Sequence, residues 1–184
     1  DFYSISALYG QEYGNNVFSG NVVISNTSSA AFYNNTFSGD VKSNTFSSNV
    51  YRNTFSGYVF NNTFSGYVYN NTFSGDVNSN TFGYVFNNTF SGNVNYNTFG
   101  YVYSNTFSSN VNNNTFSGNV RNNTFSDYVN YNTFSGNVNN NTFSGYVYSN
   151  TFGYVFNNTF SGYVNNNTFS GYVNNNTFSN DVYN

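Results

Sequence analysis

The sequence predicts an all-β protein, a parallel β-solenoid in which short repeats form a cross-β stack. Seventeen consecutive units of the form N-T-F-S-G-x-V-x-x fill residues 35–184, fourteen with nine residues and three with eight. A fixed short period of this kind is typical of stacked repeat architectures. Within each unit, Thr, Phe, Val and Tyr favour extended chain, whereas Gly and Asn favour bends and left-handed backbone.

The repeat divides the chain into three segments. Residues 1–15 do not repeat, although residues 2–9 alternate in the manner of a strand, and they are expected to be a cap or a contact between subunits. Residues 16–34 hold two degenerate repeats, as is common at the ends of repeat arrays. Residues 35–184 are the regular array. The sequence begins with Asp1 rather than Met, so we expect a processed, secreted, extracellular product.

The repeat also predicts which side chains form the core. Neighbouring residues of a strand point to opposite faces. Each Val is flanked by residues such as Asp40, Lys42 and Arg121 that belong in water, and each Phe lies between Thr and Ser. Both are therefore expected to point inward and to stack, with the junction Asn residues forming amide ladders at the corners. The representative core residues are Phe37, Phe46, Phe55, Phe64, Phe73, Phe116, Val41, Val50, Val59, Val68, Val77 and Val120.

Three eight-residue units, at 80–87, 97–104 and 150–157, lack the Ser before Gly. A deletion inside a straight strand would reverse the face of every later side chain, so the missing residue is expected to fall in a bend. All three units have even numbers in the series. This favours two units per turn of the coil, although one unit per turn remains the alternative.

Composition argues against several classes of function. Charged residues make up 5% of the chain, with only three basic residues, whereas nucleic-acid binding needs clustered Lys and Arg. No apolar run approaches the roughly 18 residues of a membrane span. There is no His or Cys. The repeat positions of Asp40 and Asp76 superficially suit a glycosidase pair, but we interpret them as charges on a wetted face.

We therefore predict no enzymatic activity, no catalytic residue, no cofactor, no metal site, no nucleic-acid partner and no membrane span. The nine-residue period is similar to that of calcium-binding repeats-in-toxin β-rolls. However, the chain lacks their paired Gly and regular Asp, so a row of calcium sites is not expected.

Outward aromatic residues form two sets in the repeat. Exposed aromatic rows indicate contact with another filament, a glycan or a surface, and cross-rung stacking is an equally good explanation. Those before Val are Tyr58, Tyr67, Tyr84, Tyr101, Tyr128, Tyr146, Tyr154, Tyr163 and Tyr172, and those after it include Phe60, Phe86 and Phe156. The Asn-Asn-Thr junctions are formal glycosylation sequons, as at Asn61, Asn70, Asn113, Asn140 and Asn166. We interpret them as a by-product of the repeat, with glycosylation as the alternative.

The Asn ladder, the aromatic column and the tandem strand-turn units make residues 16–184 resemble functional-amyloid fibre subunits such as curli, in architecture only. Curli repeats are longer and have a different Ser, Gln and Asn pattern. The resemblance implies a structural subunit of a secreted extracellular fibre, such as a biofilm matrix.

Unpaired strand edges at the ends of a solenoid invite pairing with another chain, so we expect a homopolymer assembled end to end. The candidate assembly residues are Phe2, Tyr3, Ile5, Tyr9, Val182 and Tyr183. The alternative is a surface-binding module for ice or polysaccharide, or an adhesin stalk. The Thr column that includes Thr63 and Thr72 motivates this alternative.

Overall fold

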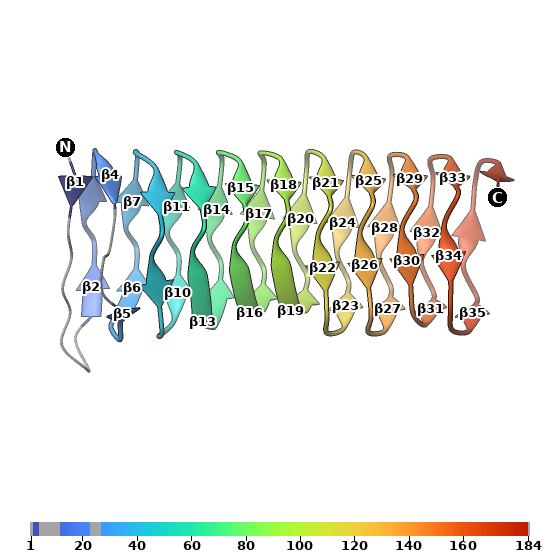
Figure 1. Ribbon diagram of the computed structural model, residues 1–184, viewed down its shortest axis with the longest axis horizontal. Coiled ribbons are helices and arrows are strands. Elements are labelled where there is room, and N and C mark those ends of the chain that lie inside the picture. Colours follow the sequence, from blue (N-terminus) through green and yellow to red (C-terminus); the bar gives the residue numbers. More distant parts are fainter. Residues whose placement is uncertain (1, 4–11, 23–26, 184) are drawn as a thin grey trace.

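The computed structural model describes residues 2, 3, 12–22 and 27–183, which form an elongated parallel β-solenoid (Figure 1). The rungs follow one another along the long axis, with the N-terminus at one end and the C-terminus at the other. Within the described residues every strand pairing is parallel, and each strand is two to seven residues long. The predicted fold class is confirmed.

Two repeat units make one turn of the coil. Asn44 bonds to Asn62, which lies 18 residues later, and Asn80 bonds to Asn97, which lies 17 residues later. Alternate units are therefore stacked on one another, as the even numbering of the short units indicated. The three eight-residue units share one stack, so their shortening alters only one side of the solenoid.

Most turns have four short strands, but Thr63–Tyr69, Thr81–Phe86 and Thr98–Tyr103 each form one longer strand, so their turns have three. In the described chain the strands associate into three sheets. The sheet that we call the Val sheet has 11 strands in the described residues and holds the Val segments of the odd-numbered units. Its strands are β1 (Phe2–Tyr3), β4 (Asn21–Val22), β8 (Val41–Lys42), β12 (Val59–Phe60), β15 (Val77–Asn78), β18 (Val94–Asn95), β21 (Val111–Asn112), β25 (Val129–Asn130), β29 (Val147–Tyr148), β33 (Val164–Asn165) and β37 (Val182–Tyr183).

The Thr-Phe sheet has 10 strands in the described residues and holds the Thr-Phe segments of the same units. Its strands are β3 (Val17–Phe18), β7 (Thr36–Phe37), β11 (Thr54–Phe55), β14 (Thr72–Phe73), β17 (Thr89–Phe90), β20 (Thr106–Phe107), β24 (Thr124–Phe125), β28 (Thr142–Phe143), β32 (Thr159–Phe160) and β36 (Thr177–Phe178).

The mixed sheet has 16 strands in the described residues and joins both segments of the even-numbered units. Its strands are β2 (Glu12–Gly14), β5 (Thr27–Ser28), β6 (Ala31–Tyr33), β9 (Thr45–Phe46), β10 (Val50–Tyr51), β13 (Thr63–Tyr69), β16 (Thr81–Phe86), β19 (Thr98–Tyr103), β22 (Thr115–Phe116), β23 (Val120–Arg121), β26 (Thr133–Phe134), β27 (Val138–Asn139), β30 (Thr151–Phe152), β31 (Val155–Phe156), β34 (Thr168–Phe169) and β35 (Val173–Asn174).

Three strands, β13, β16 and β19, run through both segments and join them into one mixed sheet, and β16 and β19 belong to short units. Between β13 and β16 the register shifts after Phe64, so that Tyr67 pairs with Tyr84 and the missing residue falls between the Phe and the Val. Phe82 and Val85 are both buried although they are three positions apart, so the chain turns a corner near Gly83. The deletion thus shortens a corner and preserves the inward set.

The core consists of Phe and Val columns that run the length of the array. Phe rings of successive turns stack, as for Phe55 and Phe73 at 4.7 Å, and the two Phe columns meet edge to face, as for Phe73 and Phe82 at 6.3 Å. These are favourable arrangements for aromatic pairs. The sequence-predicted core positions are all buried: Phe37, Phe46, Phe55, Phe64, Phe73, Phe116, Val41, Val50, Val59, Val68, Val77 and Val120.

The second degenerate repeat exchanges a large and a small residue. Ser28 takes the Phe position beneath Phe46, and Phe32 takes the Val position beneath Val50. Both are buried, and the ring of Phe32 meets Phe46 edge to face at 5.1 Å. The degenerate sequence therefore keeps a ring in the core by moving it to the other strand of the turn.

Left-handed backbone was expected at the repeat Gly as well as at Asn, but the structure places it at a different repeat position from the Gly. The residue just before each ladder Asn has positive φ, as at Asn61 (56°), but Arg52 (56°) and Tyr96 (57°) adopt the same conformation. Gly92 is not left-handed; a Cβ there would lie 2.5 Å from the carbonyl carbon of Gly75 in the preceding turn. Gly at this position thus permits close approach of neighbouring turns.

Candidate functional site

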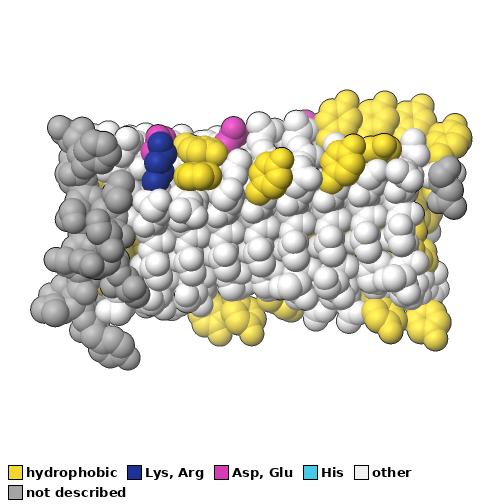
Figure 2. Space-filling view, viewed as in Figure 1, with side chains coloured by type: hydrophobic (Ala, Val, Ile, Leu, Met, Phe, Trp, Pro, Cys, Tyr) yellow, Lys and Arg dark blue, Asp and Glu magenta, His cyan; other side chains and the backbone are white. Residues whose placement is uncertain are grey.

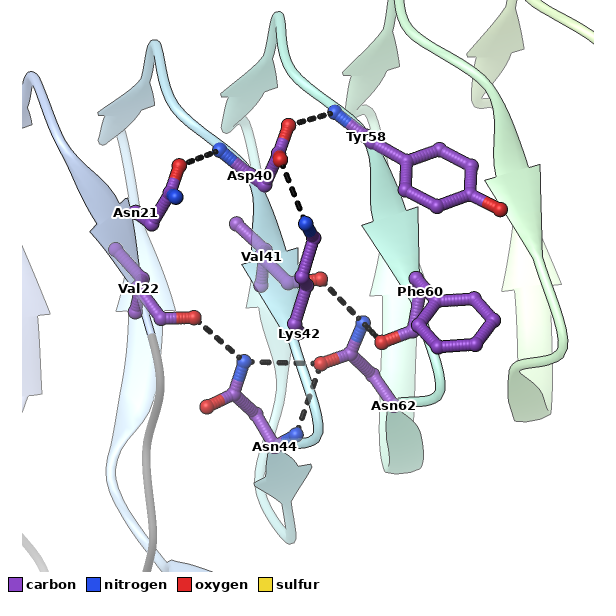
Figure 3. A network of polar contacts seen from close by, with 9 residues as sticks. All are labelled: Asn21, Val22, Asp40, Val41, Lys42, Asn44, Tyr58, Phe60 and Asn62. Atoms are coloured by element: carbon purple, nitrogen blue, oxygen red, sulfur yellow. Dashed lines mark hydrogen bonds and ion pairs between the residues drawn. The ribbon is translucent and has the colours of Figure 1, made fainter. Parts of the chain in front are cut away.

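The Asn at the start of each unit forms a buried hydrogen-bonded ladder rather than lining an exposed corner. Figure 3 shows one step: the main-chain N–H and the side-chain amide of Asn44 both donate to Oδ1 of Asn62, each at 2.9 Å. The amide of Asn62 donates to the carbonyls of Val41 and Phe60 at 2.8 and 3.0 Å. Asn62 is 2% exposed, so these bonds satisfy a polar side chain that water does not reach.

The Asp residues considered for catalysis take part in similar cross-rung bonds. Oδ1 of Asp40 accepts the main-chain N–H of Tyr58 at 2.9 Å, and Oδ2 pairs with Nζ of Lys42 at 2.9 Å (Figure 3). Both interactions favour the ionised carboxylate, so they hold the pKa of Asp40 below its usual value. Asp76 accepts the N–H of Asn93 at 2.7 Å. These carboxylates connect successive turns of the coil.

The outward Tyr residues form two separate rows because alternate units lie in different sheets. Tyr128, Tyr146 and Tyr163 flank the Val sheet, whereas Tyr67 and Tyr84 lie in strands of the mixed sheet. Tyr128 stacks on Tyr146 at 5.1 Å, and Tyr146 stacks on Tyr163 at 5.2 Å. Figure 2 shows hydrophobic side chains, a class that in this picture includes Tyr, gathered along an upper edge toward the C-terminal end.

A groove of about 460 Å³ lies on the Val sheet near this end. One row of its lining is Tyr128, Tyr146 and Tyr163, which precede the inward Val residues. The other row follows those Val residues and consists of Asn130, Tyr148, Asn165 and Tyr183. Because residues on either side of an inward Val share a face, the two rows run along the solenoid axis as parallel walls.

The second row continues toward the middle of the chain as a band of Asn side chains. Asn95 pairs with Asn112, and Asn112 pairs with Asn130. In the described part of the chain, the Oδ1 atoms of these three residues are buried and have no hydrogen-bond partner, and neither has Oδ1 of Asn110. Unpaired buried acceptors are uncommon in proteins. These Asn side chains are at outward positions of the repeat, yet their Oδ1 atoms are covered and unpaired, which makes the band unusual.

Two Tyr hydroxyls of the groove differ in acidity. Hydrogen bonds with Ser149, Asn166 and Tyr131 stabilise the phenolate and lower the pKa of Tyr148. The hydroxyl of Tyr183 instead donates to Oδ2 of Asp181 at 2.8 Å, and this bond to a carboxylate raises its pKa.

The turn that contains β34 to β37 exposes apolar side chains that other turns cover. Val173 is 46% exposed and Val182 is 51% exposed, whereas the Val residues of interior turns are at most 1% exposed. Val164 donates its main-chain N–H to the carbonyl of Asp181 in this turn. Within the described residues, the corresponding N–H of Val182 has no main-chain partner.

The structure places the assembly candidates at opposite ends. Val182 and Tyr183 form β37, and Phe2 and Tyr3 form β1, which pairs with β4. Ile5 and Tyr9 lie outside the described residues. The sequence analysis did not predict the groove row that follows Val. Alignment of every second repeat unit at these outward positions would have placed Asn130, Tyr148, Asn165 and Tyr183 in one row.

No group of residues suited to hold a metal ion occurs in the described part of the chain. The same residues contain no helix that is long and apolar enough to span a membrane.

Comparisons with known proteins assign no family to the chain. No protein-family model matches the chain, and no curated protein matches it. Among solved structures it is similar to trypsin-treated QnrB1, described as a plasmid-mediated fluoroquinolone resistance protein, with 10% sequence identity and a TM-score of 0.22. The similarity covers 87% of this chain and 79% of that one. The assignment of the fold rests on the strand pairing itself.

Proposed function

We propose that the chain is a structural subunit of a secreted extracellular fibre, assembled end to end from copies of itself. The curli-like architecture noted in the sequence motivates the extracellular, amyloid-like setting. The observation that carries the proposal is the register of the stack. Thr lies over Thr, Phe over Phe and Val over Val from turn to turn, as between β13 and β16. The face of one turn is therefore complementary to the opposite face of an equivalent turn.

The turn containing β37 presents the groups that interior turns use for stacking. Its exposed Val182 occupies the position at which Val147 and Val164 are buried. Val147 donates its N–H to the carbonyl of Tyr163 at 2.9 Å, so the N–H of Val182 is available for the same bond to another copy. Burial of exposed Val and pairing of edge groups would both favour the contact.

The contact joins one end of a copy to the other end of the next, because each turn has two different faces. The first turn of the second copy would be the one that contains β1 and β2. A head-to-tail contact does not close on itself, so it produces a filament of indefinite length. No catalytic group is needed for this role.

Electron microscopy of the purified 184-residue chain tests the proposal. We expect uniform filaments, and we expect Val182→Pro to shorten them because Pro lacks the N–H that the contact uses. Deletion of residues 1–15 should shorten them as well, because it removes β1 and β2 from the receiving end.

Val182→Ala is the matched control, because it retains the N–H and should shorten filaments less than Pro does. Wild-type protein that remains as discrete particles would contradict the proposal. Filaments of undiminished length from both the Val182→Pro variant and the chain lacking residues 1–15 would also contradict it. That result would point to lateral association through the Tyr rows.

A second candidate function is ice binding, which the Thr-Phe sheet favours. The expected single column of Thr63 and Thr72 is wrong, because with two units per turn Thr63 lies in the mixed sheet and Thr72 in the Thr-Phe sheet. Thr72 pairs with Thr89 and Thr89 with Thr106, and all three side chains are exposed in one regular column. Thermal hysteresis of the purified chain tests this candidate. Replacement of Thr89 by Tyr should abolish the effect by breaking the regular column, and no hysteresis in the unaltered chain would exclude ice binding.

A further inference from the structure

We propose that the groove on the Val sheet binds a neutral polysaccharide lying along the solenoid axis. The site consists of the Tyr-lined groove and the Asn band that continues it. This inference does not depend on fibre formation, because it concerns the side of the solenoid and not its ends.

The aromatic part of the groove suits the apolar faces of sugar rings. Tyr146, Tyr148 and Tyr183 are 45%, 37% and 53% exposed, respectively. Covering an aromatic ring with an apolar surface is favourable, so these exposed rings favour contact with a ligand. The wall that contains Tyr148 and Tyr183 is interrupted by the smaller Asn165. The open rings of Tyr148 and Tyr183 therefore lie on either side of Asn165 in this wall.

The polar part of the site supplies hydrogen-bond acceptors. Oδ1 of Asn130, which lines the groove, is buried and has no partner within the described chain. Burial of an unpaired acceptor is unfavourable, and the terminal amide torsion of Asn is soft. Rotation of the amide turns this oxygen toward a ligand hydroxyl in the groove. Asn112 and Asn95 repeat the arrangement at successive turns, so a polymer along the axis meets equivalent acceptors.

The same features identify the chemical class of the ligand. None of the described residues that line the groove is charged, which favours a neutral ligand. An added peptide strand would need free main-chain groups, but the carbonyls of Tyr146 and Tyr163 already accept the N–H groups of Val129 and Val147. A polysaccharide uses side-chain contacts alone, and it supplies the hydroxyl donors that the Asn oxygens lack.

The test measures binding of cellohexaose, xylohexaose and mannohexaose to the full chain by isothermal titration calorimetry. We expect at least one of these neutral probes to bind with a Kd below about 1 mM. Tyr148→Ala should weaken that binding by about tenfold or more. The matched control is Tyr67→Ala, which removes a ring that is 50% exposed in the mixed sheet and should leave binding unchanged.

Asn130→Val separates the binding role of Asn130 from a structural one. It removes an unpaired acceptor, so thermal stability should be unchanged or higher while sugar binding falls by about tenfold. The proposal is overturned if none of the three probes binds, or if Tyr67→Ala weakens binding as much as Tyr148→Ala does. Unchanged binding by Asn130→Val would overturn the role of the Asn band.

Discussion

The side-chain oxygen of Asn114 accepts two hydrogen bonds from one residue, Asn97. The main-chain N–H of Asn97 donates at 2.8 Å and its side-chain amide donates at 3.0 Å. The amide of Asn114 in turn donates to the carbonyls of Val94 and Asn112 at 2.7 and 3.0 Å and to Oδ1 of Asn132 at 3.0 Å. Each ladder residue therefore connects three successive turns.

We predict that Asn114→Asp destabilises the protein strongly at neutral pH. A carboxylate cannot donate to the carbonyls of Val94 and Asn112, and the site is 1% exposed, so the charge would lie beside unpaired acceptors. The expected loss is about 3–5 kcal/mol in the free energy of unfolding, measured by chemical denaturation. Asn139→Ala, at an outward position, is the control, and an equal loss there would contradict the role of the ladder.

The Phe columns predict that replacement of an inward ring costs more stability than replacement of an outward ring. Phe116 is fully buried and stacks between Phe99 and Phe134 at 5.1 and 4.6 Å, so Phe116→Ala should cost about 3–5 kcal/mol. Phe86 points outward and stacks on Tyr69 at 4.8 Å, so Phe86→Ala should cost much less. Urea denaturation measures both, and similar losses would mean that the core assignment is wrong.

The ion pair of Asp40 and Lys42 predicts a small dependence of stability on pH. The folded-state pKa of Asp40 is lowered, so its contribution is present above the unfolded-state value of about 3.9 and is lost as pH falls through the folded value. Lys42 is 40% exposed, so the contribution should stay below about 1 kcal/mol.

Asp40→Asn tests this contribution. An amide oxygen at position 40 can still accept the N–H of Tyr58, just as Asn49 accepts the N–H of Tyr67. The variant should therefore lose only the acid-dependent part of stability, seen as a flatter plot of melting temperature against pH below pH 4. An unchanged plot would show that the ion pair contributes nothing measurable.

Tyr148 and Tyr183 should ionise in a fixed order. Because the pKa of Tyr148 is lowered and that of Tyr183 is raised, Tyr148 should lose its proton first as pH rises. The contribution of Tyr183 to stability is present below its unfolded-state pKa and is lost as pH rises through the higher folded-state value. Difference absorbance of Tyr148→Phe and Tyr183→Phe against the unaltered chain gives the order, and the reverse order would contradict these hydrogen bonds.

The sequence by itself determined the repeating framework. Phe and Val recur in every unit between residues that belong in water, so strand alternation alone places them inward, as at Phe64 and Val68. The even numbering of the short units also indicated two units per turn. These features follow from local chain geometry, which acts over a few neighbouring residues.

Only the tertiary structure decided which outward residues share a surface. Asn130 and Tyr148 are neighbours because β25 pairs with β29, and such contacts depend on how many residues close one turn. The structure also decided which Asn of each junction is buried: at Asn61-Asn62, the first takes the exposed left-handed corner and the second enters the ladder. Local propensity is similar for two adjacent Asn residues, so the stacking of complete turns makes that choice.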